Sequence, residues 1–224
     1  MTKLIEPGDK ILPGNPPAVH RYRLGARLNH WTTAITMVLL VISGLAMFHP
    51  SLFFLTAIFG GGQNTRAFHP WFGVILVASF FLLFLQFWRA NLWNRSDIAW
   101  IAHIGDLVAG REDKMPEAGK YNAGQKFVFW VMALLILGMF ASGIVIWDEY
   151  FIGLTSIEIK RIAVLGHAIF AIFAILTLIL HVYAGIWVRG SFGAMIRGWV
   201  PAGWAWRHHR QWFRALVGRS EPAE

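Results

Sequence analysis

Four histidines lie in or at the ends of long apolar runs, where a titratable ring is rare. His167 and His181 share one run and stand fourteen residues apart. On a helix with about 100° and about 1.5 Å per residue, fourteen steps bring two side chains within about 40° of one face and separate them by about 21 Å. A polar ring inside a bilayer is costly and is usually functional. His69 and His30, on two other runs, supply one partner each, so the spacing predicts two stacked haems with paired histidine ligands.

The apolar runs are long enough to be transmembrane helices. Charged residues are absent from residues 28–65, 67–88, 127–147 and 162–188. Each run exceeds the about 20 residues that a helix needs to cross about 30 Å of hydrocarbon. Pro50 and the glycines at 60–62 place a connection in the first run. The sequence therefore predicts an all-α integral membrane four-helix bundle with spans at about 29–48, 67–88, 127–147 and 162–188.

Basic residues gather in alternate connections. The chain has 20 Lys and Arg residues and a formal charge of +8. Five of them lie in residues 1–30, six in 89–126 and six in 189–224, which leaves three for the other two connections. By the positive-inside rule, both termini and the central loop are cytoplasmic. This distribution explains the net charge without nucleic acid. Membrane lipid is therefore an expected partner, and nucleic acid is not.

The chain contains no cysteine. We therefore expect no disulfide, no iron–sulfur cluster held by thiolates and no c-type haem attached through a Cys-x-x-Cys-His motif. Any haem is expected to be held without a covalent bond to the protein.

Segments outside the spans have their own signals. We expect residues 1–20 to form an extended cytoplasmic arm, residues 21–190 the bundle, and residues 191–224 a basic, tryptophan-rich cytoplasmic tail that suits lipid headgroups. In the central loop, Ser96 is the predicted N-cap, and Gly110 the residue just past the end, of a short amphipathic helix on the membrane surface. Five further histidines are expected to be interfacial or solvated: His20, His49, His103, His208 and His209.

Depth in the membrane pairs the four histidines. With the N-terminus inside, His69 and His167 lie near the outer ends of their helices, whereas His30 and His181 lie toward the cytoplasm. The predicted iron ligands of two b-type haems are therefore His69 with His167, and His30 with His181. A single histidine in a membrane helix is more often a hydrogen-bonded core residue. Four rings matched in depth favour haem instead, and two ligands at each depth are too few for structural zinc.

Two glycines are expected beside the outer pair. Gly44 stands fourteen residues beyond His30, on the same helix face and at the depth of the outer haem, and Gly143 has a similar depth on the third span. A glycine there would admit the edge of a macrocycle or, equally, let two helices pack closely. Each glycine follows a serine, Ser43 or Ser142, at an offset of 99 residues, which indicates a faint repeat of a two-helix unit.

Four motifs carry a resemblance to a known family. They are Asn29-His30-Trp31-Thr32, Phe68-His69-Pro70-Trp71-Phe72-Gly73, Lys120-Tyr121-Asn122-Ala123-Gly124-Gln125-Lys126 and Leu180-His181-Val182-Tyr183. Together they resemble the membrane cytochrome b (gamma) subunit of respiratory formate dehydrogenases, over residues 20–214. The sequence Tyr-Asn-Ala-Gly-Gln-Lys separates that family from other four-histidine cytochromes b. The arm before residue 20 is longer than the family form.

The resemblance implies electron transfer in the bacterial inner membrane. In such a complex, a molybdenum- or tungsten-containing alpha subunit outside the membrane oxidises formate, and an iron–sulfur beta subunit passes electrons to the outer haem. The inner haem then reduces a quinone, menaquinone or ubiquinone, near the cytoplasm. No residue of this chain is implied as catalytic in formate oxidation. The resembling family forms trimers, so a higher-order oligomer is among the implied assemblies.

Three positions match the quinone pocket of that family: Asn122, Gly124 and Gln125, with His181 beside them. A quinone that is being reduced gains negative charge on its oxygens, so amide donors, a close backbone approach at a glycine and a proton source suit it. The second ring N–H of an iron-bound His181 is one such donor. A hydrogen bond from that N–H to backbone or water is the alternative.

Two other functions are open at this point. The cytochrome b subunit of a nickel–iron hydrogenase, or of a related quinone-linked oxidoreductase, would use the same histidines with another electron donor. A small transporter or proton channel with a histidine relay is a function of another class. It gives no reason for the fourteen-residue spacing, and its purified protein would be colourless.

Overall fold

The computed structural model describes residues 4–220, so residues 1–3 of the expected arm and 221–224 of the expected tail lie outside the described residues. The chain divides into two compact units. We call them the helical unit, Leu28–Phe84 with Val131–Leu180, and the terminal unit, which is the chain up to Arg27, Leu85–Trp130 and the chain from His181 onward.

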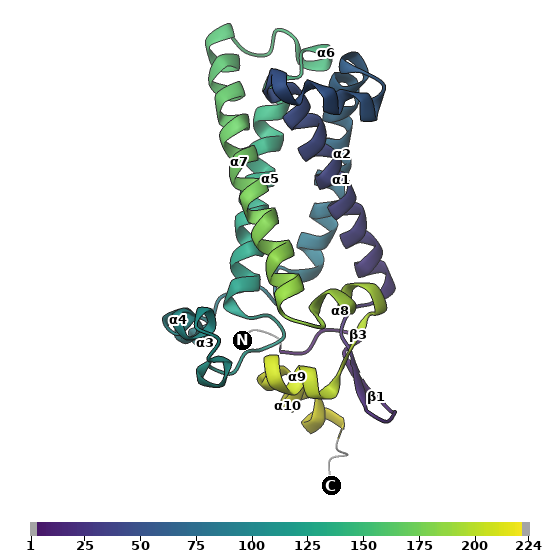
Figure 1. Cartoon of the computed structure of the whole chain (residues 1–224), viewed down its shortest axis with the longest axis vertical. Coiled ribbons are helices and arrows are strands. Elements are labelled where there is room, and N and C mark those ends of the chain that lie inside the picture. Colours follow the sequence, from purple (N-terminus) through teal and green to yellow (C-terminus); the bar gives the residue numbers. More distant parts are fainter. Residues whose placement is uncertain (1–3, 221–224) are drawn as a thin grey trace. The chain divides into compact units, whose positions relative to one another are not determined.

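Four long helices are apolar and long enough to cross a membrane (Figure 1): α1 Leu24–Phe48, α2 Gly62–Phe87, α5 Ala123–Ile146 and α7 Ile157–Trp187. They confirm the four predicted spans, and each begins about one turn before the predicted start. The predicted spans leave out the flanking charged residues, whereas a helix can include a charged side chain that has a partner. Lys126 in α5 is such a residue, because its ammonium lies 2.7 Å from the Asp97 carboxylate.

Polar and small side chains join the helices of the helical unit. The Asn29 amide nitrogen of α1 donates to the backbone oxygen of Ser79 in α2 at 3.0 Å, and the Thr33 and Ser79 hydroxyl oxygens are 2.6 Å apart. Between α5 and α7, a Cβ on Gly138 would come within 2.8 Å of the Phe170 ring. Lipid gives helices no hydrophobic reason to associate, so hydrogen bonds and close approaches of this kind hold them in register.

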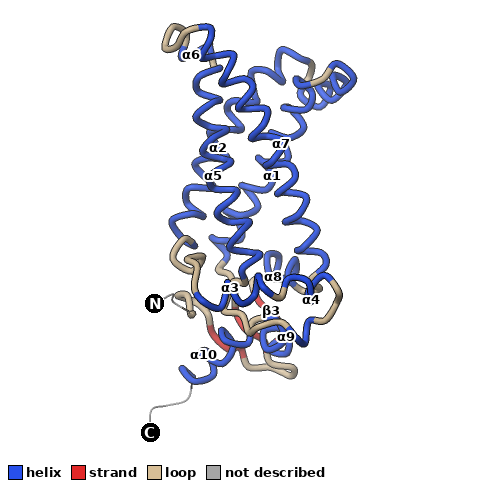
Figure 2. The backbone as a smooth tube through the Cα atoms, turned by 90° about the vertical axis from the view of Figure 1, so that its left-hand side faces the viewer, coloured by secondary structure: helices blue, strands red, loops and turns tan. Residues whose placement is uncertain are grey.

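Short helices form the connections at one end of the helical unit (Figure 2). The 3-10 helix η1, Pro50–Phe59, follows α1, and it ends at Gly60, whose φ of 82° lies in the left-handed region that glycine tolerates. The predicted connection in the first apolar run is thus confirmed. Helix α6, Asp148–Phe151, follows α5, and beside it the Trp71 and Trp147 rings pack edge to face at 5.4 Å.

In the terminal unit, both ends of the chain build one small sheet. Strand β1 Lys10–Leu12 pairs antiparallel with β2 Ala18–His20, and β2 pairs antiparallel with β3 Trp199–Pro201. Val19 lies opposite Val200 in this register. The described part of the expected arm is therefore folded against the tail. The tail helices are α8 Ser191–Arg197, α9 Ala202–His208 and α10 Arg210–Ser220.

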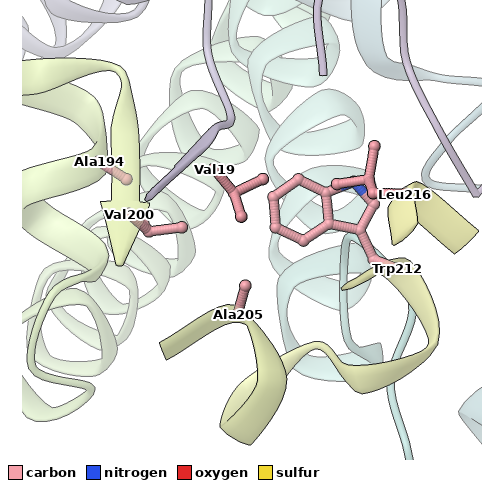
Figure 3. Close-up of a cluster of buried hydrophobic side chains, with 6 residues drawn as sticks. All are labelled: Val19, Ala194, Val200, Ala205, Trp212 and Leu216. Carbon is pink, nitrogen blue, oxygen red and sulfur yellow. The ribbon is translucent and has the colours of Figure 1, made fainter. Parts of the chain in front are cut away.

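The tail also gives the terminal unit a hydrophobic core (Figure 3). Trp212, Val19 and Val200 are fully buried there, with Ala205 and Leu216 beside them. The expectation that the tail tryptophans lie among lipid headgroups does not hold for Trp212. Its indole is buried in this core, and its ring nitrogen is satisfied there by the Asp9 carboxylate at 2.9 Å.

A buried lysine ties the arm to the central loop. Lys120 is 3% exposed, and its ammonium lies 2.5 Å from the Glu6 carboxylate and 2.6 Å from that of Asp9. The Trp212 indole nitrogen donates to Asp9 at 2.9 Å. Burial raises the pKa of the Glu6 carboxyl, and the Lys120 ammonium opposes that rise. An ammonium is stable in such a place only where partners of this kind neutralise it.

His209 was expected at a surface, and this expectation is wrong because the residue is 2% exposed. Its Nδ1 donates to the backbone oxygen of Gly119 at 2.7 Å, and its Nε2 accepts from Arg21. Burial lowers the pKa of His209 well below 6.5, and the Arg21 guanidinium lowers it further. The ring is therefore neutral in the folded protein.

We expect the terminal unit to lose stability as the pH falls below about 6.5, because the unfolded chain then binds a proton at His209 that the folded chain does not bind. One such proton changes the unfolding free energy by about 1.4 kcal/mol per pH unit. His208, whose pKa burial also lowers, acts in the same direction, whereas Glu6 with its raised pKa opposes both at pH values above 4.5. Urea unfolding can be followed by tryptophan fluorescence at several pH values. The unfolding free energy should depend less steeply on pH in His209→Gln than in the wild type, and equal dependence in the two proteins would contradict the prediction.

The predicted surface helix of the central loop is present as two short helices, α3 Arg95–Ala102 and α4 Ile104–Val108. Its N-cap is Asn94 rather than Ser96. The Asn94 side-chain oxygen accepts from the Asp97 backbone N–H at 3.2 Å and the Asp97 carboxylate accepts from the Asn94 backbone N–H at 2.7 Å, which is a capping box. Gly110, with a φ of 73°, lies just past the end of α4 as predicted. A 3-10 turn, η2 Glu112–Lys114, follows. The large apolar side chains that these two helices expose are Ile98, Ile101, Ile104 and Val108.

Candidate functional site

The structure brings together the predicted outer pair of histidines. His69 of α2 and His167 of α7 have ring centroids 6.3 Å apart, and their ring planes meet at 70°. Both residues are half-buried and both belong to the helical unit. Two imidazoles from different helices thus come together in an apolar helix bundle, at this distance and without stacking.

This separation fits a metal ion between the two rings. An imidazole nitrogen binds a transition metal at about 2 Å and lies about 1 Å from the centre of its own ring, so two rings on opposite sides of one ion have centroids about 6 Å apart. Among residues 4–220, no group of three or more His, Cys, Asp or Glu side chains could hold an ion. An ion between His69 and His167 therefore needs further ligands from a group such as a porphyrin.

The other nitrogen of each ring is already bonded. Nδ1 of His69 lies 2.7 Å from the Ser43 hydroxyl oxygen, and Nδ1 of His167 lies 3.0 Å from that of Ser142. The backbone oxygen of Met139 is also 3.0 Å from Nδ1 of His167. Nε2 of each ring is thus the nitrogen left for a metal bond. Sequence reasoning missed the role of both serines, although the repeated Ser-Gly pair was a signal for it.

Both predicted glycines lie against the two rings. A Cβ on Gly44 would be 3.4 Å from Cε1 of His69, and a Cβ on Gly143 would be 3.6 Å from Cε1 of His167. The sequence suggested room for a macrocycle edge or close packing of helices. The observed neighbour of each glycine is the imidazole itself, so α1 and α5 each place a serine hydroxyl and a glycine against the same edge of one histidine ring.

The inner pair, His30 and His181, stays a prediction. His30 lies in α1 and belongs to the helical unit, whereas His181 lies in α7 and begins the last segment of the terminal unit. Helix α7 runs without a break from Ile157 to Trp187, so His167 and His181 keep their fourteen-residue spacing on one helix. That continuity is what the depth argument from the sequence requires.

The predicted quinone residues form the start of α5 and belong to the terminal unit, as His181 does. Asn122 and Gln125 make a reciprocal capping box: each side-chain oxygen accepts from the backbone N–H of the other residue at 3.0 Å. This pairing was not predicted, and it occupies the amide oxygens but not the amide nitrogens. Gly124 admits the Trp100 ring of α3, because a Cβ there would come within 3.3 Å of it.

A comparison with known families finds one that matches most of the chain. Residues 21–198 match the family described as prokaryotic cytochrome b561. The chain belongs to the prokaryotic cytochrome b561 family. Membership makes it a multi-pass membrane protein, and it implies haem b as the cofactor.

Curated relatives of this cytochrome b561 are formate dehydrogenase subunits. The chain is 40% identical over 201 residues to the cytochrome b556(fdo) subunit of formate dehydrogenase from Escherichia coli K12, which covers 90% of this chain and 94% of the relative. It is 36% identical over 190 residues to the nitrate-inducible cytochrome b556(Fdn) subunit of the same organism, with coverage of 85% and 88%. The cytochrome b556 subunit from Haemophilus influenzae is 35% identical over 208 residues, with coverage of 93% and 87%. The resemblance carried by the four motifs is confirmed.

The outer site of this cytochrome b561 fits the haem b that the family implies. Two imidazoles have the separation of axial ligands, and each has its Nδ1 bonded to the protein. Glycines rather than bulkier residues lie against both rings. The geometry therefore suits a metal that the protein ligates from two sides only, which is the ligation of a six-coordinate haem iron.

Proposed function

We propose that this cytochrome b561 is the membrane subunit of a formate dehydrogenase and carries electrons through two b-type haems to a quinone. The relatives named above match nearly the whole chain and are formate dehydrogenase subunits, which favours formate over hydrogen as the source of electrons. The observation that carries the proposal is the outer pair, His69 and His167, with ring centroids 6.3 Å apart.

Each haem would be held by two histidines from different helices. A bound haem b supplies a centre that gains and loses one electron. His69 and His167 would hold the outer one through Nε2, and His30 and His181 the inner one. Both Nδ1 bonds would keep the rings from turning away from the iron.

The quinone would bind at the start of α5, near the cytoplasmic side. Asn122 and Gln125 have amide nitrogens that the capping box leaves available as donors. Such preorganised donors stabilise the charge that develops on a quinone oxygen during reduction. Gly124 lies against the Trp100 ring of α3, which would line the pocket beside the quinone, and His181 would donate from the nitrogen that does not bind iron.

The partners of the chain follow from this role. Electrons would arrive from an iron–sulfur beta subunit, which receives them from a molybdenum- or tungsten-containing alpha subunit on the periplasmic face of the bacterial inner membrane. This chain would take no part in formate binding. With both termini cytoplasmic, electrons cross inward while protons for quinol come from inside. Each charge moved costs about 2.3 kcal/mol per 100 mV of membrane potential, which formate oxidation must drive.

A haem assay on the purified complex tests the proposal first. We expect two b-type haems per cytochrome chain, both reduced when formate is added, and a membrane potential in sealed vesicles of the correct orientation. One haem per chain would remove the inner pair, and a haem-free complex would overturn the proposal. Two haems that formate leaves oxidised, but hydrogen reduces, would instead assign the chain to a hydrogenase.

The capping box makes a clean test of the quinone donors possible. Asn122→Asp and Gln125→Glu keep the side-chain oxygens that cap α5 and remove the amide N–H donors. We expect both variants to retain two haems and to reduce quinone at least about tenfold more slowly, since loss of one preorganised donor to a developing negative charge typically costs about a hundredfold or more. The comparison with Asn122→Ala, which loses the cap as well, separates helix stability from quinone binding. Unchanged quinone reduction in both carboxylate variants would place the pocket elsewhere.

A further inference from the structure

Two serine hydroxyls occupy matching places in the outer site. Ser43 precedes Gly44 on α1 and contacts His69, while Ser142 precedes Gly143 on α5 and contacts His167. We propose that Ser43 and Ser142 are positioning residues that fix the tautomer and the rotation of the two outer haem ligands, with Ser43 the more important. The proposal rests on the haem-binding part of the function proposed above.

The direction of the hydrogen bonds follows from what each group can donate. The Ser43 hydroxyl oxygen lies 2.7 Å from the backbone oxygen of Leu39, which can only accept. The single hydroxyl hydrogen is used in that bond. The contact with Nδ1 of His69 must then be donated by the ring, so His69 carries its hydrogen on Nδ1 and leaves a lone pair on Nε2.

The second site leads to the same tautomer by an independent route. The Ser142 hydroxyl oxygen lies 2.7 Å from the backbone oxygen of Gly138, as Ser43 does from Leu39. In addition, Nδ1 of His167 lies 3.0 Å from the backbone oxygen of Met139, and a carbonyl oxygen can only accept. His167 therefore also carries its hydrogen on Nδ1. Both rings present an unprotonated Nε2, which is the form that binds a metal.

The two sites differ in how much depends on the serine. Among the described residues, Ser43 is the one hydrogen-bond partner of the His69 Nδ1, and its side chain is completely buried. Nδ1 of His167 has two acceptors, Ser142 and the backbone of Met139. Loss of Ser43 would leave the His69 ring with no hydrogen bond at Nδ1, whereas loss of Ser142 would leave His167 held by a backbone carbonyl that no side-chain substitution removes.

Removing an acceptor from a metal-bound imidazole also changes the metal. An Nδ1–H that donates strongly makes the imidazole a better electron donor, which favours the oxidised iron. We therefore expect Ser43→Ala to raise the ratio of reduced to oxidised outer haem at a fixed potential about tenfold, which is about 59 mV for one electron. The same change at Ser142 should alter this ratio by less than about threefold, because Met139 still accepts.

The test is a redox titration and a low-temperature electron paramagnetic resonance spectrum of the whole complex for Ser43→Ala, Ser142→Ala and Ser43→Thr. The low-spin signal of the outer haem reports the angle between the ligand planes, so it should change in Ser43→Ala and be restored by Ser43→Thr. Thr36→Val is the matched control. It removes a buried hydroxyl of α1 that makes the same bond to a carbonyl four residues earlier, and the described contacts of Thr36 include no histidine.

Each outcome decides the matter. An unshifted potential and signal in both alanine variants, or equal shifts in the two, overturns the proposal while leaving the haem site intact. A wild-type complex without the outer haem overturns the proposed function and the positioning role together. If Ser43→Ala loses both haems, the subunit has failed to fold. Ser43→Cys, which keeps the size of the side chain but accepts weakly, then supplies the measurement and should shift in the same direction.

Discussion

Replacing His167 with alanine should remove one haem from each chain and leave the other in place. His167 and His69 lie in the helical unit with ring centroids 6.3 Å apart, and alanine leaves His69 as a lone ligand. A haem iron with one protein ligand loses its low-spin spectrum, and the haem is held less tightly without the second ligand. The haem assay should fall from two to one per chain, and formate should no longer reduce the remaining haem, because the entry point for electrons is gone.

The control for this variant is His103→Ala. His103 lies between α3 and α4, and its Nδ1 bonds only its own segment, at the Ala99 backbone oxygen. The His103→Ala variant should keep both haems and full electron transfer. Equal loss of both haems in His167→Ala, in a subunit that still assembles and melts normally, would contradict the pairing of His69 with His167.

Replacing Lys120 with methionine should have the largest effect on stability. The ammonium lies within 2.6 Å of two carboxylates, and removal of one partner from a buried ion pair typically costs about 3–5 kcal/mol because the other charges stay buried. Asp9 would keep the Trp212 indole as a donor, whereas Glu6, whose pKa burial already raises, would lose the group that opposes that rise. We expect the terminal unit to unfold at lower urea concentration and the arm to become open to proteases.

Lys160→Met serves as the matched control for Lys120→Met. Lys160 also pairs with an aspartate, Asp148, but in that pair the aspartate side chain is 58% exposed. Exposed ion pairs contribute about 0–1 kcal/mol, so this variant should unfold almost as the wild type does. If both lysine variants lose the same amount of unfolding free energy, the ion pairs of Lys120 with Glu6 and Asp9 do not hold the arm.

The helices of this protein were predictable because hydrocarbon restricts what can cross it. A span needs about 20 apolar residues in a helix, and the charge-free runs met that requirement four times. The errors fell at the helix starts, where Lys126 is kept inside α5 by Asp97. The cap at Asn94 was missed for a related reason, because two polar residues competed for one role and only the backbone geometry decides between Asn94 and Ser96.

The terminal unit was predictable only in part. Its core joins Val19 to Val200 and Trp212, which are far apart in the chain, and contacts of that kind leave no periodic pattern in a sequence. The basic, tryptophan-rich tail was predicted to lie among lipid headgroups. The burial of His209 followed from the same folding of the tail onto the arm, and no local feature of the sequence indicated it.

The outer site was predictable as far as helix geometry reaches. Depth along a helix follows from residue number, so His69 and His167 could be paired without knowing how the helices are rotated. The serines were missed because their contacts depend on that rotation. At the start of α5, Asn122 and Gln125 were read as quinone donors alone, but their oxygens cap the helix, and the two roles use different atoms of the same amide.

The pairing of β2 with β3 also has a consequence for the order of events during synthesis. The ribosome makes β2 before any of the four long helices and β3 after all of them. Val19 therefore lacks its partner Val200, and Asp9 lacks the Trp212 indole, until the membrane-spanning part of the chain has been made. A nascent chain that stops before β3 presents an open strand edge at β2 and leaves Val19 uncovered, and exposed strand edges and apolar surface of this kind make an unfinished chain prone to aggregation.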